Sequence, residues 1–210
     1  MKIICITGTP GTGKTTLSKK LAKELNYHYI DVNKIIKKYK FSEGYDRKRK
    51  TKIVDVKKLN KKLVQIIIFF KKYNFIDDAL LSRAGSTRTL TRLNIKKITL
   101  NKKFNKNSLK NIKKYNGIII DSHLSHYLPK RYVDLVIVTK CDIKELNKRL
   151  KRKRFNKNKI KENLQAEIFD VCYNEALERK HKVIAIDTTK SFNISSVAKH
   201  LGGLNAVKKD

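Results

Sequence analysis

The sequence Gly8-Thr-Pro-Gly-Thr-Gly-Lys14-Thr15 matches the phosphate-binding loop pattern G-x-x-x-x-G-K-[ST] at every fixed position. An apolar run at residues 3–6 precedes it, and leucines occur after it at helical spacing, at positions 17, 21 and 25. This context of strand, loop and helix favours a functional loop over a chance match. We call residues 8–16 the phosphate loop.

The residue types of the phosphate loop suit a triphosphate. Glycines let the backbone turn its N–H groups toward phosphate oxygens, and the N-terminus of the following helix adds a positive dipole. Lys14 would neutralise the β and γ phosphate oxygens, and Thr15 would offer its hydroxyl to Mg²⁺. The sequence therefore predicts a binding site for ATP with Mg²⁺.

Length and composition predict one domain over residues 1–210. With 210 residues and 40% hydrophobic content, the chain can bury one core, with a small appendage beside it. The first apolar run is too short for a signal peptide, and the longest, residues 64–70, is too short to span a membrane. Scattered cysteines at positions 5, 141 and 172 predict free thiols, a cytoplasmic protein and no structural metal.

The net charge of +33, from 51 basic and 18 acidic residues, predicts attraction to polyanions, among which nucleic acid is the most abundant. Base composition of the genome, or a surface adapted to salt or heat, would also give a chain rich in lysine and asparagine. We favour a polyanion-binding surface because the acidic residues are too few to balance the charge locally.

Apolar strands alternate with helices along the chain, which predicts an α/β fold with a parallel sheet covered by helices on both faces. Ligands of such sheets bind beyond the carboxyl ends of the strands, where Gly8, Asp121 and Asp187 fall. The expected strands are 2–7, 29–32, 117–121, 133–139 and 183–187, and the expected helices are 14–25, 34–39, 55–72, 143–152, 159–179 and 193–201.

Residues 76–115 differ in amino-acid composition from the rest of the chain. Three arginines stand among small and hydroxyl residues, followed by lysine pairs and repeated Asn-Lys, with only short apolar pieces. We interpret this stretch as a basic inserted arm or a partly ordered loop.

Two polar residues follow the strand expected at 117–121. Asp121 can bind Mg²⁺ together with Thr15, or it can merely cap a turn, and the upstream loop favours the metal role. His123 can orient a water molecule or sense the γ-phosphate, or it can be structural. The other histidines are expected to be structural, at positions 28, 126, 181 and 200.

The stretch LKRKRFNKNKI, residues 150–160, predicts a cationic lid that closes over the phosphates. The alternative is a solvated helix end. That alternative fits Lys157 and Lys159 better than it fits Arg152, Lys153 and Arg154.

Four blocks of sequence resemble the adenylate kinase isoenzyme six family. They are GTPGTGKTT from Gly8, DSHLSHYLP from Asp121, NLQAEIFDVCYNEA from Asn163 and IDTTK from Ile186. The resemblance covers about residues 1–65 and 116–200. It implies the fold of a nucleoside monophosphate kinase with a short lid, transfer of the γ-phosphoryl of ATP to AMP or a related monophosphate, and slow ATPase activity.

The resemblance also assigns roles residue by residue. Asp121 and His123 would form the pair used in hydrolysis, Lys190 would contact adenine, and residues 152–162 would form the lid. The ATP phosphates would be held by Gly11, Gly13, Lys14, Thr15, Thr16 and the lid cations Lys153 and Arg154. The monophosphate would bind in residues 30–54, at Asp31, Asn33, Lys37 and Tyr45.

The sequence departs from the family pattern in four places. One is the gap between Asp55 and Asp121, which is about 40 residues longer than in the family. The family lid reads R-G-Y, whereas this chain has Lys153-Arg154-Phe155, so a clamping arginine is shifted or replaced by a lysine that cannot bind in the same bidentate way. Lys37 stands where an arginine can meet the phosphate of the monophosphate. Residues 47–50 are all basic where relatives often carry acidic residues.

The family further implies a role in late maturation of the 30S ribosomal subunit and its 16S rRNA, with a ribosomal protein of the S-eleven type and precursor rRNA as partners. Two functions therefore stay open: a monophosphate kinase with ATPase activity, and an ATPase that acts only as an assembly factor. A kinase of the shikimate or gluconate type is a weaker third, because the sequence specifies no pocket for such a substrate.

Overall fold

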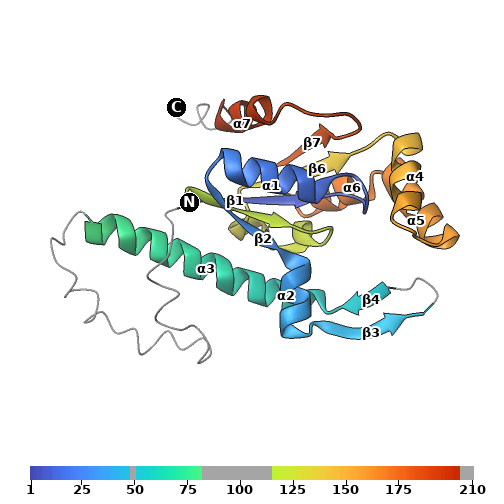
Figure 1. The fold of residues 1–210 in the computed structure, drawn as a ribbon. Helices are drawn as coiled ribbons and strands as arrows, with labels where there is room; N and C mark the ends of the chain where they lie inside the picture. The colour runs from blue at the N-terminus through green and yellow to red at the C-terminus, as the bar shows by residue number, and fades with distance from the viewer. Residues whose placement is uncertain (48–50, 82–114, 204–210) are drawn as a thin grey trace.

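The computed structural model describes residues 1–47, 51–81 and 115–203. Its centre is a sheet of five parallel strands in the order β2-β5-β1-β6-β7 (Figure 1). The predicted parallel sheet is confirmed, and each strand begins and ends within two residues of its expected bounds. The strands are β1 Lys2–Thr7, β2 Tyr27–Asp31, β5 Gly117–Asp121, β6 Leu135–Lys140 and β7 Val183–Asp187.

The register of the strands brings their carboxyl ends together. Asp121 of β5 lies opposite both Ile6 of β1 and Asp31 of β2. On the other side of the central strand β1, Lys140 of β6 pairs with Asp187 of β7. The phosphate loop therefore begins beside several polar residues at the carboxyl ends of the strands.

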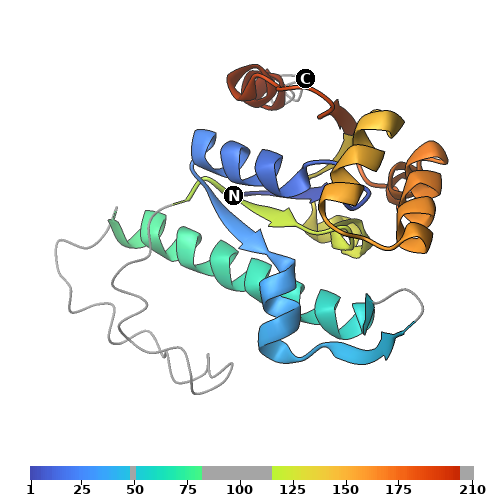
Figure 2. The same ribbon diagram turned by 45° about the vertical axis from the view of Figure 1, so that its right-hand side comes forward.

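Helices cover both faces of the sheet, as predicted (Figures 1 and 2). Alternate strand residues point to opposite faces, so Ile3 and Ile118 pack with α3 and α6 while Ile4 and Ile119 pack with α1 and α7. Branched apolar strands buried on both faces are typical of parallel sheets. The covering helices are α1 Lys14–Glu24, α3 Val56–Leu81, α6 Val171–Glu178 and α7 Ile194–Gly203.

A short helix and a hairpin stand apart from the sheet, where Figure 1 shows the hairpin projecting beyond α2. Helix α2, Val32–Tyr39, begins at Asp31, whose carboxylate accepts the N–H of Asn33 at 2.9 Å. The antiparallel strands β3 Ser42–Asp46 and β4 Thr51–Val54 come next. The sequence indicates a monophosphate segment in this region but does not predict its strands.

The predicted helix over residues 159–179 is wrong, because two helices occupy this region. Helix α5, Lys157–Ile168, ends before Asp170, which adopts left-handed backbone with φ 52° and starts α6. Aspartate tolerates this conformation better than most residues. Lys140 at the end of β6 forms ion pairs with Asp170 and with Glu167, so the corner is fixed against the sheet.

Helix α3 continues to Leu81, so residues 76–81 of the predicted basic arm are helical. Most of that arm, residues 82–114, lies outside the described residues, as do the basic residues 48–50. Tyr115 is described, and its ring meets that of His28 edge-on at 5.0 Å. Among the described residues, no helix combines the length and apolarity needed to cross a membrane.

Candidate nucleotide-binding site

The phosphate loop connects β1 to α1 and turns tightly at its glycines. Gly8 and Gly11 adopt positive φ angles of 136° and 101°. A Cβ atom on Gly8 would approach the carbonyl oxygen of Thr139 to 2.6 Å, and one on Gly11 would approach Leu146 to 2.9 Å. Both positions therefore favour glycine. Gly13, the second fixed glycine of the motif, also has a positive φ, of 91°.

Hydroxyl groups brace the loop against the neighbouring strands. The Oγ1 atoms of Thr12 and Thr139 lie 2.6 Å apart, and the Thr139 hydroxyl donates to the Thr7 carbonyl at 3.2 Å. The Thr188 hydroxyl, from the end of β7, contacts the carbonyl oxygens of Thr12 and Lys140. Such a buried and satisfied network makes the loop rigid.

Lys14 lies inside the curve of the loop. Its Nζ donates to the carbonyl oxygens of Gly8 and Thr9, each at 2.8 Å. Burial lowers the pKa of Lys14 to about 8, and the nearby cation of Lys153 acts in the same direction. The ammonium group is still mostly charged at neutral pH, so the loop holds a positive charge beside two backbone acceptors.

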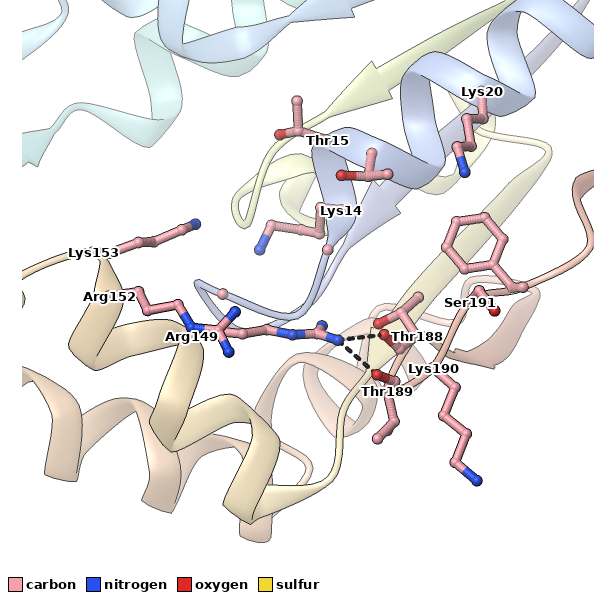
Figure 3. Close-up of a pocket in the computed structure, with 14 residues that line it drawn as sticks. Lys14, Thr15, Lys20, Arg149, Arg152, Lys153, Thr188, Thr189, Lys190 and Ser191 are labelled. Carbon is pink, nitrogen blue, oxygen red and sulfur yellow. Dashed lines mark hydrogen bonds between the residues drawn. The ribbon is translucent and has the colours of Figure 1, made fainter.

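A cavity of about 580 Å³ opens above the loop (Figure 3). Seven of the eight residues predicted to bind ATP line it, and Arg154 does not. In Figure 3 Lys153 extends from the end of α4, Ile143–Arg152, toward Lys14, whereas the Lys190 side chain extends away from both. The lining also includes Arg152 of the predicted lid and residues without a predicted ATP-binding role, Lys20, Arg149, Thr188, Thr189, Ser191 and Phe192.

Arg149 joins α4 to the loop after β7. Its guanidinium donates to the carbonyl oxygens of Thr188 at 3.0 Å and Thr189 at 2.7 Å, and its Nε donates to Glu145 at 3.0 Å (Figure 3). These bonds hold the arginine as a fixed wall of the cavity. The Glu145 and Arg149 spacing of four residues predicts a surface ion pair, so the sequence alone would not identify this role.

The two predicted ligands of Mg²⁺ converge on one hydroxyl. Tyr29 donates from its hydroxyl to Oδ2 of the buried Asp121 at 2.9 Å, and the Thr15 side chain lies within hydrogen-bonding reach of the same hydroxyl. Burial and the Asp121 charge raise the pKa of Tyr29. A carboxylate and a hydroxyl are hard oxygen ligands that fit Mg²⁺, which takes few protein ligands when phosphates supply the rest.

His123 lies just beyond β5, accessible from a second cavity. Desolvation by the surrounding protein, together with the cations of Lys14 and Lys159, lowers the pKa of His123 to about 4. The imidazole is therefore neutral at physiological pH. The charge of Lys14 acts on the imidazole, although His123 itself lines the second cavity and not the first.

The second cavity, of about 490 Å³, is lined by two of the four residues predicted to bind the monophosphate, Asn33 and Lys37, and by His123. Asp31 instead caps α2, and Tyr45 is 57% exposed on β3 and is not among the lining residues. Lys40, for which the sequence predicts no role, also lines this cavity from the left-handed end of α2. The remaining lining residues are Ile36, Ser42 and Val54.

Other histidines make structural contacts. His126 is buried, with Nδ1 2.7 Å from the Thr7 hydroxyl and Nε2 2.8 Å from a carboxylate oxygen of Glu175. Nε2 of His181 lies 3.0 Å from the carbonyl oxygen of His126. His28 packs against Phe70, with ring centroids 4.6 Å apart. The side chain of His200 lies outside the part of the chain whose side chains are described.

Known proteins resemble this chain over most of its length. A family profile described as an AAA domain matches residues 4–85 and 87–170. A protein of Methanocaldococcus jannaschii named "Putative adenylate kinase" is 33% identical, and the alignment covers 89% of this chain and 76% of that protein. The "Adenylate kinase isoenzyme 6 homolog" of Dictyostelium discoideum is 27% identical over 88% of this chain and 79% of its own length. The chain belongs to the adenylate kinase isoenzyme 6 family.

The match extends to solved structures at lower similarity. A shikimate kinase of Acinetobacter baumannii, in complex with shikimate, aligns with all of this chain and 95% of its own at 14% identity and a TM-score of 0.47. A likeness of this size assigns no substrate to this member of the adenylate kinase isoenzyme 6 family.

The segment predicted to form the lid carries its cations in an unexpected order, and this leads to a prediction. Arg152 and Lys153 line the cavity, whereas Arg154 has left-handed backbone with φ 56° and does not. We expect Arg152→Ala to lower kcat/KM for ATP about tenfold, because a cation near the phosphates is lost. Arg154→Ala is the matched control, and steady-state kinetics should leave its kcat/KM within twofold of the parent protein, about the scatter of such assays. The reverse order of effects would contradict the prediction.

Proposed function

We propose that this protein is a nucleoside monophosphate kinase that transfers the γ-phosphoryl group of ATP to AMP or a related monophosphate in the cytoplasm. The observation that carries the proposal is the pair of cavities, one built on the phosphate loop and lined by Lys14, the other built on α2 and lined by His123, a histidine whose pKa the Lys14 cation lowers. Phosphoryl transfer between two nucleotides requires two neighbouring binding sites, whereas hydrolysis requires only one.

ATP would occupy the first cavity. The backbone of Gly11 and Gly13, with Lys14, Thr15 and Thr16, would hold its phosphates, and Lys153 with Arg152 would cover them from the lid. The base would lie near the loop that carries Lys190, where Lys20 sits over the ring of Phe192 with Nζ 5.3 Å from the centroid. Thr15 and Asp121 would hold Mg²⁺, which when bound supplies charge neutralisation for the phosphate oxygens.

The monophosphate would occupy the second cavity. Lys37 and Lys40 are exposed cations on its wall and would attract the acceptor phosphate, while the Asn33 side chain can donate to a phosphate or sugar oxygen. Because His123 is neutral, it can accept or donate a hydrogen bond between the two sites without repelling Lys14. Closure of the predicted lid over both nucleotides would exclude water, which would favour transfer to the acceptor over hydrolysis.

The test of the proposal is product stoichiometry. The protein is incubated with Mg-ATP, with and without AMP, and ADP, AMP and free phosphate are separated and quantified. A kinase forms two ADP for each AMP consumed, with no matching release of phosphate. Phosphate release that is indifferent to AMP would overturn the kinase proposal and support an ATPase instead.

Lys37 gives a prediction specific to the acceptor site. We expect Lys37→Ala to raise the KM for AMP about tenfold and to leave the KM for ATP unchanged, because one of two cations near the acceptor phosphate is lost. Lys34→Ala is the matched control, an exposed lysine of the same helix that does not line the cavity. Initial rates measured while each substrate is varied in turn separate the two constants. Equal changes in both would contradict the prediction.

A second candidate function is favoured by the net charge of +33. In this alternative the protein uses ATP hydrolysis as a timing switch in 30S assembly, bound to precursor rRNA and a ribosomal protein of the S-eleven type. RNA affinity should then fall steeply with salt through counterion release. His123→Ala should remove ATPase activity and leave RNA binding intact. Loss of both together would argue against separate sites.

A further inference from the structure

His126 is a buried ionisable side chain to which the proposed function gives no role. It lies in the short 3-10 helix Ser125–Tyr127 that follows β5, and it is 1% exposed. A buried polar ring is costly unless its nitrogens are hydrogen-bonded. Both nitrogens of His126 have partners, since Nδ1 lies 2.7 Å from the Thr7 hydroxyl and Nε2 lies 2.8 Å from Oε2 of Glu175. These partners differ in chemistry, and the difference gives the hydrogen bonds a direction.

Glu175 determines which nitrogen of His126 carries the proton. A carboxylate can only accept a hydrogen bond, so Nε2 is the donor. Burial lowers the pKa of His126, although the Glu175 carboxylate acts in the opposite direction, so the ring is mostly neutral at physiological pH. Nδ1 of a neutral ring protonated at Nε2 is an acceptor. The Thr7 hydroxyl therefore donates to Nδ1, and the hydrogen bonds run from Thr7 through His126 to Glu175.

Glu175 and His126 are held by contacts from several elements. Tyr127 donates from its hydroxyl to Oε2 of Glu175 at 3.1 Å, and the Arg179 guanidinium lies 4.2 Å from the centre of the Tyr127 ring. Nε2 of His181, which precedes β7, lies 3.0 Å from the carbonyl oxygen of His126. Arg179 and His181 both oppose a positive charge on His126. The neutral ring is therefore fixed in place.

Thr7 joins these hydrogen bonds to the candidate nucleotide-binding site. It is the last residue of β1, it is fully buried, and Gly8 of the phosphate loop follows it. Its hydroxyl has a single proton and two acceptors within reach, Nδ1 of His126 at 2.7 Å and the carbonyl oxygen of His123 at 3.4 Å. The shorter contact takes the proton while Nδ1 is an acceptor. If the ring proton moved to Nδ1, the ring would donate to Thr7, and the hydroxyl would turn to His123.

The direction of the Thr7 hydroxyl matters because His123 lines the second cavity, whereas Thr7 leads into the loop that holds Lys14. A hydroxyl bonded to His126 ties the start of the phosphate loop to the segment that follows β5. A hydroxyl bonded to the His123 carbonyl would instead pull that peptide toward β1. Phosphoryl transfer is sensitive to such displacements, since the reacting groups must lie within a narrow range of distances.

We propose that Glu175 and His126 are positioning residues for phosphoryl transfer. Glu175 keeps the His126 proton on Nε2, and Nδ1 then holds the Thr7 hydroxyl, which fixes His123 relative to the phosphate loop. Neither Glu175 nor His126 lines either cavity, so both act through Thr7. The kinetic part of the proposal rests on the proposed function, whereas the direction of the hydrogen bonds does not.

Two substitutions of Thr7 test the kinetic part. Thr7→Val preserves the shape of the side chain and removes the hydroxyl, whereas Thr7→Ser preserves the hydroxyl and removes a buried methyl group. We expect Thr7→Val to lower kcat for ADP formation about tenfold and to leave the KM for ATP unchanged, because other hydroxyl groups still brace the loop. Thr7→Ser should keep at least about half of the parent kcat. If Thr7 only packed the core, the serine variant would be the more impaired. Rates are measured below the melting temperature of both variants.

The position of the proton is measured separately. The chemical shifts of imidazole nitrogens distinguish the two tautomers in isotope-labelled protein at slightly alkaline pH, and the His126 signals are those that disappear in His126→Gln. We expect the tautomer protonated at Nε2 in the parent protein. Glu175→Gln should populate both tautomers, because an amide can accept or donate, and it should lower kcat as well. Glu178→Gln is the matched control, an exposed glutamate at the end of the same helix, and should resemble the parent protein in both measurements.

Two results would overturn the proposal. One is a His126 proton on Nδ1 in the parent protein, since the Thr7 hydroxyl would then not donate to the ring. The other is a Thr7→Val variant with the parent kcat. Phosphate release that is indifferent to AMP would contradict the kinase proposal alone. The same variants are then compared by their rates of phosphate release, and the tautomer measurement needs no activity.

Discussion

Replacing Lys14 by alanine is expected to lower kcat/KM for phosphoryl transfer by about a thousandfold, the upper end of what one preorganised donor contributes. The loop holds the ammonium group in place before any substrate arrives, with Nζ 2.8 Å from two carbonyl oxygens. Protein atoms around it limit its contact with water, so its attraction to a transferring phosphoryl group is less screened than that of a surface lysine. The rate should be measured with saturating and with limiting ATP.

Two controls separate this effect from loss of structure. Lys23→Ala removes an exposed lysine in the last turn of the same helix and should keep full activity. Lys14→Ala should unfold at the same temperature as the parent protein or at a higher one, because burial lowers the pKa of Lys14 and its charge is therefore costly to the folded state. A variant that keeps more than about a tenth of the parent kcat/KM would show that the loop backbone carries the site.

The sequence was sufficient to predict the sheet and the phosphate loop because both depend on local patterns. Buried strands such as residues 3–6 and 117–121 are continuous apolar runs, and the loop needs glycines at fixed positions. The strand register then places Gly8, Asp121 and Asp187 together at the carboxyl ends of the strands, as a parallel sheet requires.

Other features depend on contacts that the sequence does not encode locally. The strands β3 and β4 carry no alternating apolar pattern, and Glu43, Gly44 and Tyr45 are exposed, so nothing marked them as strands. The break at Asp170 depends on an ion pair to Lys140, far away in the chain. Arg149 acquires its place only when the carbonyl groups after β7 reach it.

Asp121→Asn should lower kcat by about a hundredfold or more and raise the Mg²⁺ concentration needed for half-maximal rate, since a neutral amide is a poor ligand for a hard cation. Asparagine has nearly the same shape and can still accept the hydrogen bond from Tyr29, now 2.9 Å from a carboxylate oxygen. The loss should therefore come from the missing charge rather than from repacking. Magnesium titrations at fixed ATP measure both effects.

Tyr29→Phe distinguishes a direct role of Asp121 from an indirect one. This variant removes the hydroxyl that lies between Asp121 and Thr15 but leaves the carboxylate charge in place. If Asp121 binds Mg²⁺, the phenylalanine variant keeps most of its kcat and its Mg²⁺ dependence, because the hydroxyl only steadies a group that the strand end already fixes. If both variants lose activity equally at every Mg²⁺ concentration, Asp121 acts by holding Tyr29, and the metal must bind elsewhere.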